Sequence, residues 1–447
     1  MSLKYQCQPT DKGYYTLDAG VAAPTRLFFS EKLYAESEEG LYAQIKTATE
    51  YPGVQQVVVT PDAHIGTTVP VGTVIATDGA LLHSPVGYDV GCGILCFRSD
   101  VSAAKGRDEK LKRKWSEEVM KRVGVGVGQP GAASLTRRHF AEIIRLGAAA
   151  LHYNHGETER DRLPVDDGWT PPAKAVEKGL QQLGSLGGGN HFIELQHDQD
   201  GFLWGMIHTG SRGFGYNLAA HYIALARAEG KARGDRTSGD ATYFPQDSPH
   251  WDGYRNAVAA GGNFATANRL TIYEAVATAF RRVFGAEAEL YYEISHNLAQ
   301  FETLPDGREA WVHRKGATRA FPAGHPALAG GKWAATGHPV LIPGSMGDSS
   351  FVLFPKEGAA NALYSVNHGC GRRMSRGEAR QKLTQSGVNK QMRTLGVLVN
   401  GGGVDVPIDE SPDVYKRSKD VIAAVVAADL AEVRYTLTPL ATIKGAD

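Results

Sequence analysis

Apolar residues recur along the chain in two patterns, short β-branched runs and longer stretches with helical spacing. The uninterrupted run at 57–60 predicts a buried strand that ends at Pro61, because proline cannot donate to a sheet ladder. The segments 192–195 and 202–207 predict a pair of neighbouring strands. Further strands are predicted at 291–295, 311–314, 351–354 and 433–437, and helices at 107–123, 136–152, 216–229, 255–284 and 414–428. This alternation indicates an α/β (α+β) fold with mixed sheets.

Two polar segments rich in Gly, Asp and Pro interrupt the pattern at 154–171 and 230–253. Both are predicted to be surface insertions, since neither has the composition of a linker between domains. Ser375 and Glu378 have the spacing of a capping box, which predicts that a helix begins there. We therefore expect one domain over 1–447 with helical insertions.

Glycine changes the picture most, because 53 of 447 residues are glycine, about 12% against an average of about 7%. Without a collagen-like period, this excess predicts many loops that turn sharply or approach a ligand closely. Lys plus Arg and Asp plus Glu both number 48, which excludes a protein covered in one sign of charge. The cysteines are too few for a disulfide framework and no signal peptide or membrane span is evident, so we expect a cytoplasmic protein.

Most of the glycine-rich loops follow an apolar strand and carry a His, Cys or Asp. They are PDAHIG at 61–66, GYDVGCG at 87–93, GGGNHFIE at 187–194, HTGSRG at 208–213, EISHN at 293–297, HRKGATR at 313–319, PGSMGDSS at 343–350 and HGCGRRMSRGEA at 368–379. Loops at strand ends converge while the sheet holds them rigidly, which is a common way to assemble a metal site.

Five side chains in these loops are candidate metal ligands. Asp89 and Cys92 are three residues apart in a glycine loop, so a carboxylate and a thiolate can face the same point. His191, His208 and His296 each stand at a predicted strand–loop junction. A lone histidine there is more often structural, but five ligands exceed one tetrahedral site and predict two metals bridged by the thiolate. Imidazole and thiolate accept Zn, Co, Fe or Mn, and the carboxylate favours Mn.

A second candidate centre is His368, which stands beside two glycines and is followed by Arg372, Arg373 and Arg376. Guanidinium groups beside an accessible imidazole suit a phosphate or polyphosphate. Histidine can also attack phosphorus and form a phosphoramidate. The alternative, a solvated Arg-rich turn before a helix, leaves the histidine unexplained.

Three further residues have competing interpretations. Asp62 follows a predicted strand, where a turn with an Asx hydrogen bond is the alternative, and we favour a functional role. His64 is left open. Cys96 is expected to be a core residue, since no second cysteine pair completes a four-cysteine site.

Taken together and in order, GYDVGCG, GGGNHFIE, HTGSRG, EISHN, HRKGATRAFP, PGSMG, HGCGRRMSR and the late IKG closely resemble the RtcB family of RNA-splicing ligases. The motifs cover 61–447. The resemblance implies an RtcB-like domain whose mixed sheets surround a central cleft for metal and nucleotide. It also implies joining of RNA 2′,3′-cyclic phosphate or 3′-phosphate ends to 5′-hydroxyl ends, with GTP and two Mn ions as cofactors. An archease-like activator is a further implied partner.

The same resemblance implies a role for individual residues. His368 is the expected guanylylated nucleophile and Asp62 its orienting carboxylate, while Cys92 bridges the two metals. The implied nucleotide-binding residues are Asn190, His191, Phe192, Ile193, Glu194, His296, Asn297, Pro343, Gly344, Ser345, Met346, Ser350, His368, Gly369, Cys370, Gly371 and Lys444. The expected contacts to RNA phosphates are Arg212, Arg314, Lys315 and Arg372.

The chain also departs from the family pattern, with Cys370 where the motif has alanine and a different region at 100–180. These departures suggest a divergent paralogue, for which a role in tRNA splicing and a role in RNA repair both stay open. The main alternative is a metal-dependent RNA cyclic phosphodiesterase that does not ligate, which has no use for His368 or Lys444. A non-catalytic RNA-binding relative predicts broken ligand positions, and a structural zinc protein predicts closed four-ligand spacing; the sequence has neither.

Overall fold

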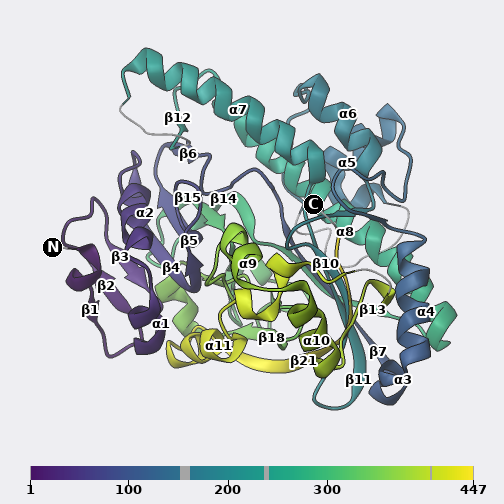
Figure 1. Ribbon diagram of the computed structural model, residues 1–447. Helices are drawn as coiled ribbons and strands as arrows, with labels where there is room; N and C mark the ends of the chain where they lie inside the picture. The colour runs from purple at the N-terminus through teal and green to yellow at the C-terminus, as the bar shows by residue number, and fades with distance from the viewer. Residues whose placement is uncertain (1, 152–161, 236–240, 403–404, 446–447) are drawn as a thin grey trace.

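Two large sheets organise the protein, and the computed structural model describes them within residues 2–151, 162–235, 241–402 and 405–445 (Figure 1). One has eight strands, in the order β13 (Glu289–Ser295), β7 (Gly93–Ser102), β11 (Phe202–Thr209), β10 (Phe192–His197), β21 (Ala431–Ile443), β18 (Ser350–Pro355) and β17 (Val340–Ile342), with β20 (Leu398–Val399) beside β21. The other has seven, in the order β1 (Gln8–Pro9), β2 (Tyr15–Leu17), β3 (Thr25–Leu27), β4 (Val54–His64), β5 (Val71–Thr77), β15 (Glu309–Lys315) and β14 (Asn297–Thr303). Antiparallel pairs dominate, but β3–β4 and β20–β21 are parallel, so the prediction of mixed sheets is confirmed.

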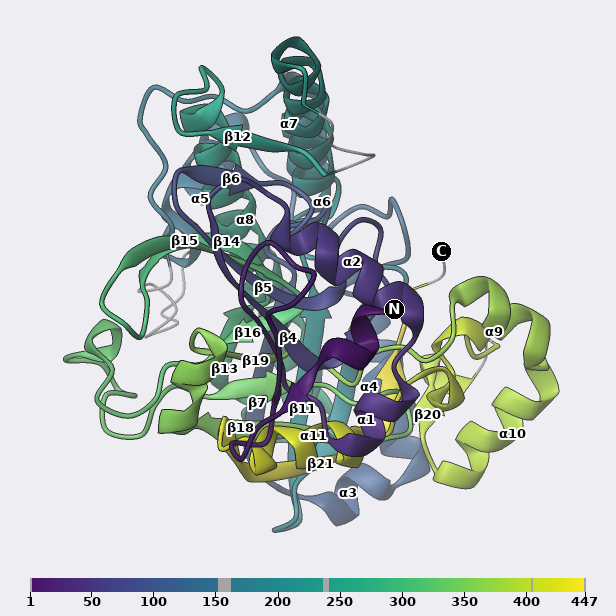
Figure 2. The ribbon, with the colours of Figure 1, turned by 90° about the vertical axis from the view of Figure 1, so that its left-hand side faces the viewer.

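Helices and short strand pairs surround these sheets. The helices are α1 (Glu31–Glu36), α2 (Glu39–Thr49), α3 (Ala103–Arg107), α4 (Glu109–Met120), α5 (Arg137–Leu146), α6 (Ala173–Gln182), α7 (Arg212–Arg233), α8 (Trp251–Phe284), α9 (Arg376–Lys382), α10 (Gln385–Leu395) and α11 (Ser418–Ala427). The short pairs are β6 (Ala80–Leu82) with β12 (Tyr243–Pro245), β8 (Gly124–Val125) with β9 (Ser185–Gly187), and β16 (Ala317–Arg319) with β19 (Ser365–Asn367). Helices α9 and α10 project together from one side (Figure 2).

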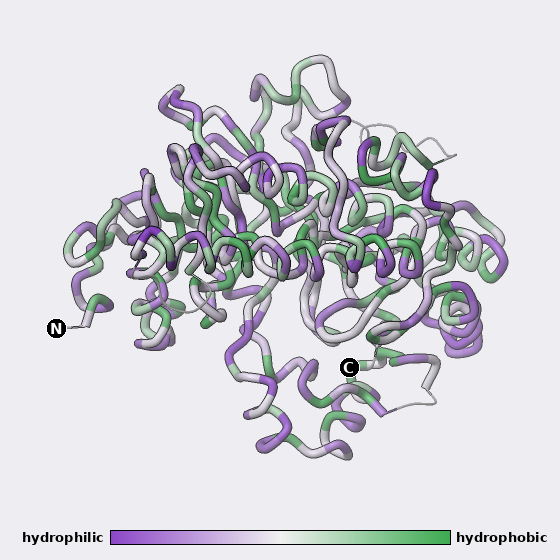
Figure 3. Tube along the Cα trace, turned by 90° about the horizontal axis from the view of Figure 1, so that it is seen from above, coloured by the Kyte–Doolittle hydropathy of each residue, from purple (hydrophilic) through white to green (hydrophobic). Residues whose placement is uncertain are grey.

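Hydrophobic residues concentrate in the middle of the molecule, where the chain is largely green in Figure 3. Leu95 and Phe97 of β7 share a core with Leu270 and Phe280, so α8 covers one face of the eight-stranded sheet. A second core joins the two sheets and α11. Helix α8 is buried on all sides from Asn256 to Leu270, where its polar side chains, Arg269 among them, find partners inside the protein. No helix in the described ranges is long and apolar enough to cross a membrane.

Strand β4 is longer than the sequence predicts, because Pro61 does not end it. Val59 still pairs with Thr73, and the ladder resumes at His64 opposite Val71 after a register shift. Proline is tolerated at such a bulge, where no ladder hydrogen bond is required of it. The prediction of a strand end was therefore wrong, and Asp62 lies inside an irregular strand whose bend re-aims side chains.

Two predicted helices are shorter or divided. The segment 107–123 contains the end of α3 and the whole of α4, which meet at Asp108, whose side chain caps α4 by accepting from Lys110 and Leu111. Helix α5 stops at Leu146 because Gly147 takes a φ of 57° and begins a 3-10 turn. Both boundaries are set by local capping rather than by the apolar period.

The predicted strand pair, the capping box and the C-terminal elements are found in the structure. The predicted strand pair is the antiparallel ladder β10–β11, and Ser375 caps α9 by accepting from Glu378 N–H at 3.1 Å. The predicted helix at 414–428 is a 3-10 turn followed by α11, and the strand at 433–437 is part of the longer β21. Helix α7, β12 and the start of α8 occupy much of the segment predicted as an insertion at 230–253, of which 236–240 lie outside the described residues. Of 154–171, residues 162–171 contain neither helix nor strand, and the rest lie outside the described residues.

Candidate active site

The candidate metal ligands gather where four adjacent strands of the eight-stranded sheet begin or end. Because β13, β7, β11 and β10 are antiparallel neighbours, the beginnings of β7 and β10 lie beside the ends of β11 and β13. Cys92 directly precedes β7, and His191 directly precedes β10. His208 is next to last in β11, and His296 follows β13. A rigid sheet therefore sets the spacing of ligands that are far apart in sequence.

The ligand atoms face one another at short range. Cys92 Sγ lies 3.4 Å from His191 Nε2 and 3.3 Å from His208 Nε2. His208 Nε2 is 3.3 Å from His296 Nε2, and His191 Nε2 is 3.0 Å from Asp89 Oδ2. The ligand atoms of Cys92, His191 and His208 all lie within 4.8 Å of one another, and Asp89 and His296 extend this group on either side, so the donor set fits bound cations.

Burial prepares these groups for a cation. It lowers the pKa of His208 and of His296 well below the ordinary imidazole value, which keeps both rings neutral as metal ligation requires. Burial, and then the neighbouring Asp89, raises the pKa of the Cys92 thiol. A cation offsets that penalty by binding the thiolate.

The loop that holds Cys92 is fixed from behind by α8. Gly91 has a φ of 75°, and a Cβ there would lie 2.9 Å from the α8 backbone, so both the conformation and the space call for glycine. Arg269 of α8 is fully buried and donates to the carbonyl oxygens of Gly91 at 2.7 Å and Thr209 at 2.9 Å. It also donates to Ser295 Oγ at 2.8 Å and pairs with buried Glu293. One guanidinium thus ties three strand ends together beneath the cluster.

His368 lies against the same cluster, with its ring centroid 4.9 Å from that of His296. Its Nδ1 is 2.7 Å from Oδ2 of Asp62, which is fully buried. The carboxylate also accepts from Thr60 Oγ1 at 2.6 Å and from the backbone N–H of Gly369 at 3.2 Å. Burial opposes ionisation of Asp62, but the charge and hydrogen bond of His368 outweigh it and lower the pKa. An ionised Asp62 holds the proton on Nδ1 and leaves the lone pair of Nε2 free.

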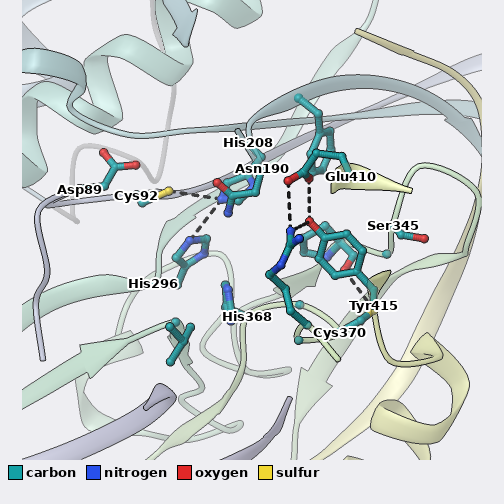
Figure 4. A pocket seen from close by; sticks show the side chains of 18 of the residues that line it. Asp89, Cys92, Asn190, His208, His296, Ser345, His368, Cys370, Glu410 and Tyr415 are labelled. Atoms are coloured by element: carbon teal, nitrogen blue, oxygen red, sulfur yellow. Dashed lines mark hydrogen bonds and ion pairs between the residues drawn. The ribbon is translucent and has the colours of Figure 1, made fainter. Parts of the chain in front are cut away.

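The other end of the cleft is lined by buried charges, on the opposite side of Figure 4 from Asp89. Glu410 accepts from Lys444 Nζ at 3.0 Å, from Arg372 at 3.2 Å and from the Tyr415 hydroxyl at 2.6 Å. Burial acts to raise the pKa of Glu410, but Lys444 and its other partners lower it. This end of the cleft therefore places cationic side chains around one carboxylate, an arrangement that can bind a polar ligand.

Strand β10 forms part of the cleft wall with alternating side chains. Phe192 and Glu194 line the cleft, whereas Ile193 is fully buried in the core behind the sheet. Burial raises the pKa of Glu194 to about 8. Ser350 does not line the cleft. Its hydroxyl accepts from Gln196 at 2.9 Å and from the N–H of Gly344 at 3.0 Å, and it thereby supports the loop beside the cleft.

These parts enclose one cleft of about 340 Å³. Most residues predicted from the sequence line it: Asp89, Cys92, Asn190, Phe192, Glu194, His208, His296, Asn297, Lys315, Pro343, Gly344, Ser345, Met346, His368, Gly369, Cys370, Gly371, Arg372 and Lys444. The predicted residues that do not line it are Asp62, His191, Ile193, Ser350, Arg212 and Arg314. Asp62 and His191 lie directly behind lining residues.

The two arginines differ in where they lie. Arg212 begins α7, and its Nη1 is 3.0 Å from His191 Nδ1, so it borders the candidate metal ligands. Arg314 is buried and paired with Glu302, and it donates to Ser365 Oγ at 2.9 Å. The structure therefore does not bring Arg314 to the cleft.

Glu410 and Tyr415 were missed by sequence reasoning because they lie outside the glycine-rich motifs. No local sequence signal marks them, because Arg372 and Lys444, the cations that surround Glu410, come from distant parts of the chain. His64, left open from the sequence, lines the cleft, and Cys96 is a fully buried core residue as expected.

Comparison with known proteins identifies the family of the chain. The family described as "RtcB: tRNA-splicing ligase RtcB" matches residues 44–445. The tRNA-splicing ligase RtcB of Thermococcus kodakarensis is 32% identical, with 96% of each chain covered, and that of Archaeoglobus fulgidus is 32% identical, with 95% of each covered. The RNA-splicing ligase RtcB of Mycobacterium tuberculosis is 33% identical over 90% of this chain and 100% of its own. On this evidence the chain belongs to the RtcB family.

Proposed function

We propose that the protein is a GTP-dependent RNA ligase that joins a 2′,3′-cyclic phosphate or 3′-phosphate end to a 5′-hydroxyl end. One observation carries the proposal: His368, held through Nδ1 by buried Asp62 at 2.7 Å, lies in the same cleft as the Cys92 cluster. A non-ligating phosphodiesterase has no use for an oriented histidine nucleophile beside its metal site.

The reaction begins with attack of His368 Nε2 on the α-phosphorus of GTP. The P–N bond forms as the bond to the β-phosphate oxygen breaks, and pyrophosphate leaves. A 3′-phosphate oxygen of RNA, produced by hydrolysis where the end is cyclic, then attacks the same phosphorus and releases the histidine. Finally the 5′-hydroxyl attacks the RNA phosphate, a phosphodiester forms and GMP leaves.

The described residues suit each task. Asp62 keeps Nε2 unprotonated for the first step. Lys444, Arg372 and Glu194 lie at the end of the cleft that would receive the guanosine, with cations and a carboxyl group for its polar edges. Asp89, Cys92, His191, His208 and His296 would hold two Mn²⁺ ions, whose charge favours negative phosphoryl groups. Zn²⁺ and Co²⁺ suit the same donors.

The decisive experiment incubates the purified protein with Mn²⁺ and GTP labelled at the α-phosphate, followed by denaturing electrophoresis. Wild type should retain acid-labile label, and His368→Ala should retain none. Labelled protein given RNA with a 3′-phosphate and RNA with a 5′-hydroxyl should release GMP and yield joined RNA. Absence of label with any divalent metal, together with hydrolysis of cyclic phosphate ends, would instead establish the phosphodiesterase alternative. An archease-like activator and a role in tRNA splicing or RNA repair stay predictions, checked by adding each component or substrate to this assay.

A further inference from the structure

Two tyrosines stack at the Asp89 end of the cleft. The rings of Tyr88 and Tyr216 have centroids 5.2 Å apart and an interplanar angle of 28°. Tyr88 lines the cleft, whereas Tyr216, on the first turns of α7, is 55% exposed. The pair therefore reaches from the cleft wall to the surface, where more than half of Tyr216 is exposed.

The stacked pair lies away from the buried charges. Tyr88 directly precedes Asp89, and Figure 4 places Asp89 on the opposite side of the view from Ser345 and Tyr415. Beside Tyr88, Gly87 lines the cleft and has open space where a side chain would project. A ligand that occupies the Glu410 end thus leaves this end accessible.

Cations accompany the aromatic pair. Arg212 is four residues before Tyr216, at the beginning of α7, and its guanidinium is 3.0 Å from His191 Nδ1. The aliphatic stem of Lys178 packs against Gly213, three residues before Tyr216, and Lys178 is exposed. An aromatic face flanked by cations is how proteins bind single-stranded nucleic acid, because bases stack while phosphates pair with the cations.

We propose that Tyr88 and Tyr216 form a stacking platform for one base of the RNA strand whose end enters the cleft at Asp89. The platform rests on the proposed function for the identity of the polymer. It adds a site that holds the RNA near the metal cluster and His368 without contacting either. Stacking tolerates any base, so the platform contributes affinity and positioning rather than sequence choice.

The test measures RNA binding without GTP, by fluorescence anisotropy of short labelled RNAs that carry either a 3′-phosphate or a 5′-hydroxyl. Tyr216→Ala should weaken binding of one of them about fivefold or more, the equivalent of about 1 kcal/mol at 1.4 kcal/mol per tenfold. Tyr216→Phe keeps the ring and should stay within about twofold of wild type. Tyr5→Ala removes a tyrosine that is 68% exposed on the N-terminal 3-10 helix, and should change nothing.

A scan of abasic sites along the RNA locates the stacked base. At one position the missing base should weaken binding to wild type by the same factor as Tyr216→Ala, and should cost nothing further in that variant. Equal affinity of wild type and Tyr216→Ala, or losses that add at every position, would overturn the platform. GTP labelling of His368 without RNA should be unchanged in Tyr216→Ala. Failure of labelling in wild type would instead refute the proposed function, so the two failures are distinguishable.

Discussion

Arg269 offers a direct test of how the fold positions the candidate metal ligands. Its guanidinium is fully buried and ties Gly91, Thr209 and Ser295 to α8 while it pairs with Glu293, which is 1% exposed. Arg269→Met keeps the apolar stem of the side chain and removes the charge. We expect this variant to lose both stability and metal.

The magnitude follows from what the substitution leaves behind. Removing one partner of a buried ion pair costs about 3 to 5 kcal/mol, because Glu293 is left charged or must take up a proton. The Thr209 carbonyl oxygen loses its donor, which adds about 1 to 3 kcal/mol where no water replaces it. The Gly91 carbonyl oxygen keeps a bond from Ser295 Oγ at 3.2 Å. We therefore expect a loss of at least about 4 kcal/mol, a large part of the roughly 5–15 kcal/mol that stabilises a domain.

The assay is urea unfolding monitored by tryptophan fluorescence, and bound metal is measured on the same samples. The double variant Arg269→Met/Glu293→Gln lacks the unpaired carboxylate of Glu293, so it should lose less stability than Arg269→Met alone. Arg282→Met is the matched control on the same helix, since the Arg282 side chain is 63% exposed and should contribute less than about 0.5 kcal/mol. A loss below about 1 kcal/mol for Arg269→Met, or a double variant as damaged as the sum of its parts, would refute the reasoning.

Three further substitutions test the cleft. Asp62→Asn should slow GTP labelling of His368 by roughly 10²-fold or more, because an amide favours the tautomer that protonates Nε2; an unchanged labelling rate would contradict this. Cys92→Ala should abolish binding of at least one metal ion in elemental analysis, whereas Cys96→Ala, buried four residues later, should keep the wild-type metal content. Burial raises the pKa of Glu194 from 4.5 to about 8, so the folded chain binds a proton that the unfolded chain lacks between these values. The free energy of unfolding of wild type relative to Glu194→Gln should therefore fall as pH rises from about 5 to 8, by up to roughly 1.4 kcal/mol per pH unit, and level off above; a difference independent of pH would rule this out.

Much of the site could be predicted from the sequence because its chemistry lies in glycine-rich loops at strand ends. Cys92, His208 and His296 were identified as a set, and the sheet brings them within hydrogen-bonding distance. Contacts made by ordinary strand and loop residues were not predictable in this way. Glu410 binds Lys444 across a sequence separation of 34, and nothing local marks either as the partner of the other.

The fold shows the same limit. Periodicity located β10, β11 and α8, whose apolar patterns are long or clearly bounded. It failed where a local feature overrides the period, as at the bulge around Pro61 and at the cap formed by Asp108. Arg314 illustrates the same difficulty for charge, since its position in a motif gave no indication that Glu302 would hold it in the interior.

Strand β21 has a consequence for how the protein is made. It is the last strand of the described chain, yet it lies between β10 and β18, and Lys444 directly follows it. During synthesis, β10 and β18 emerge from the ribosome before β21, the strand that pairs with an edge of each in the described structure. His368 and the candidate metal ligands are therefore synthesised before β21, which is needed to complete the eight-stranded sheet. Chaperones that cover strand edges should matter more for this protein than for one whose central strands come first.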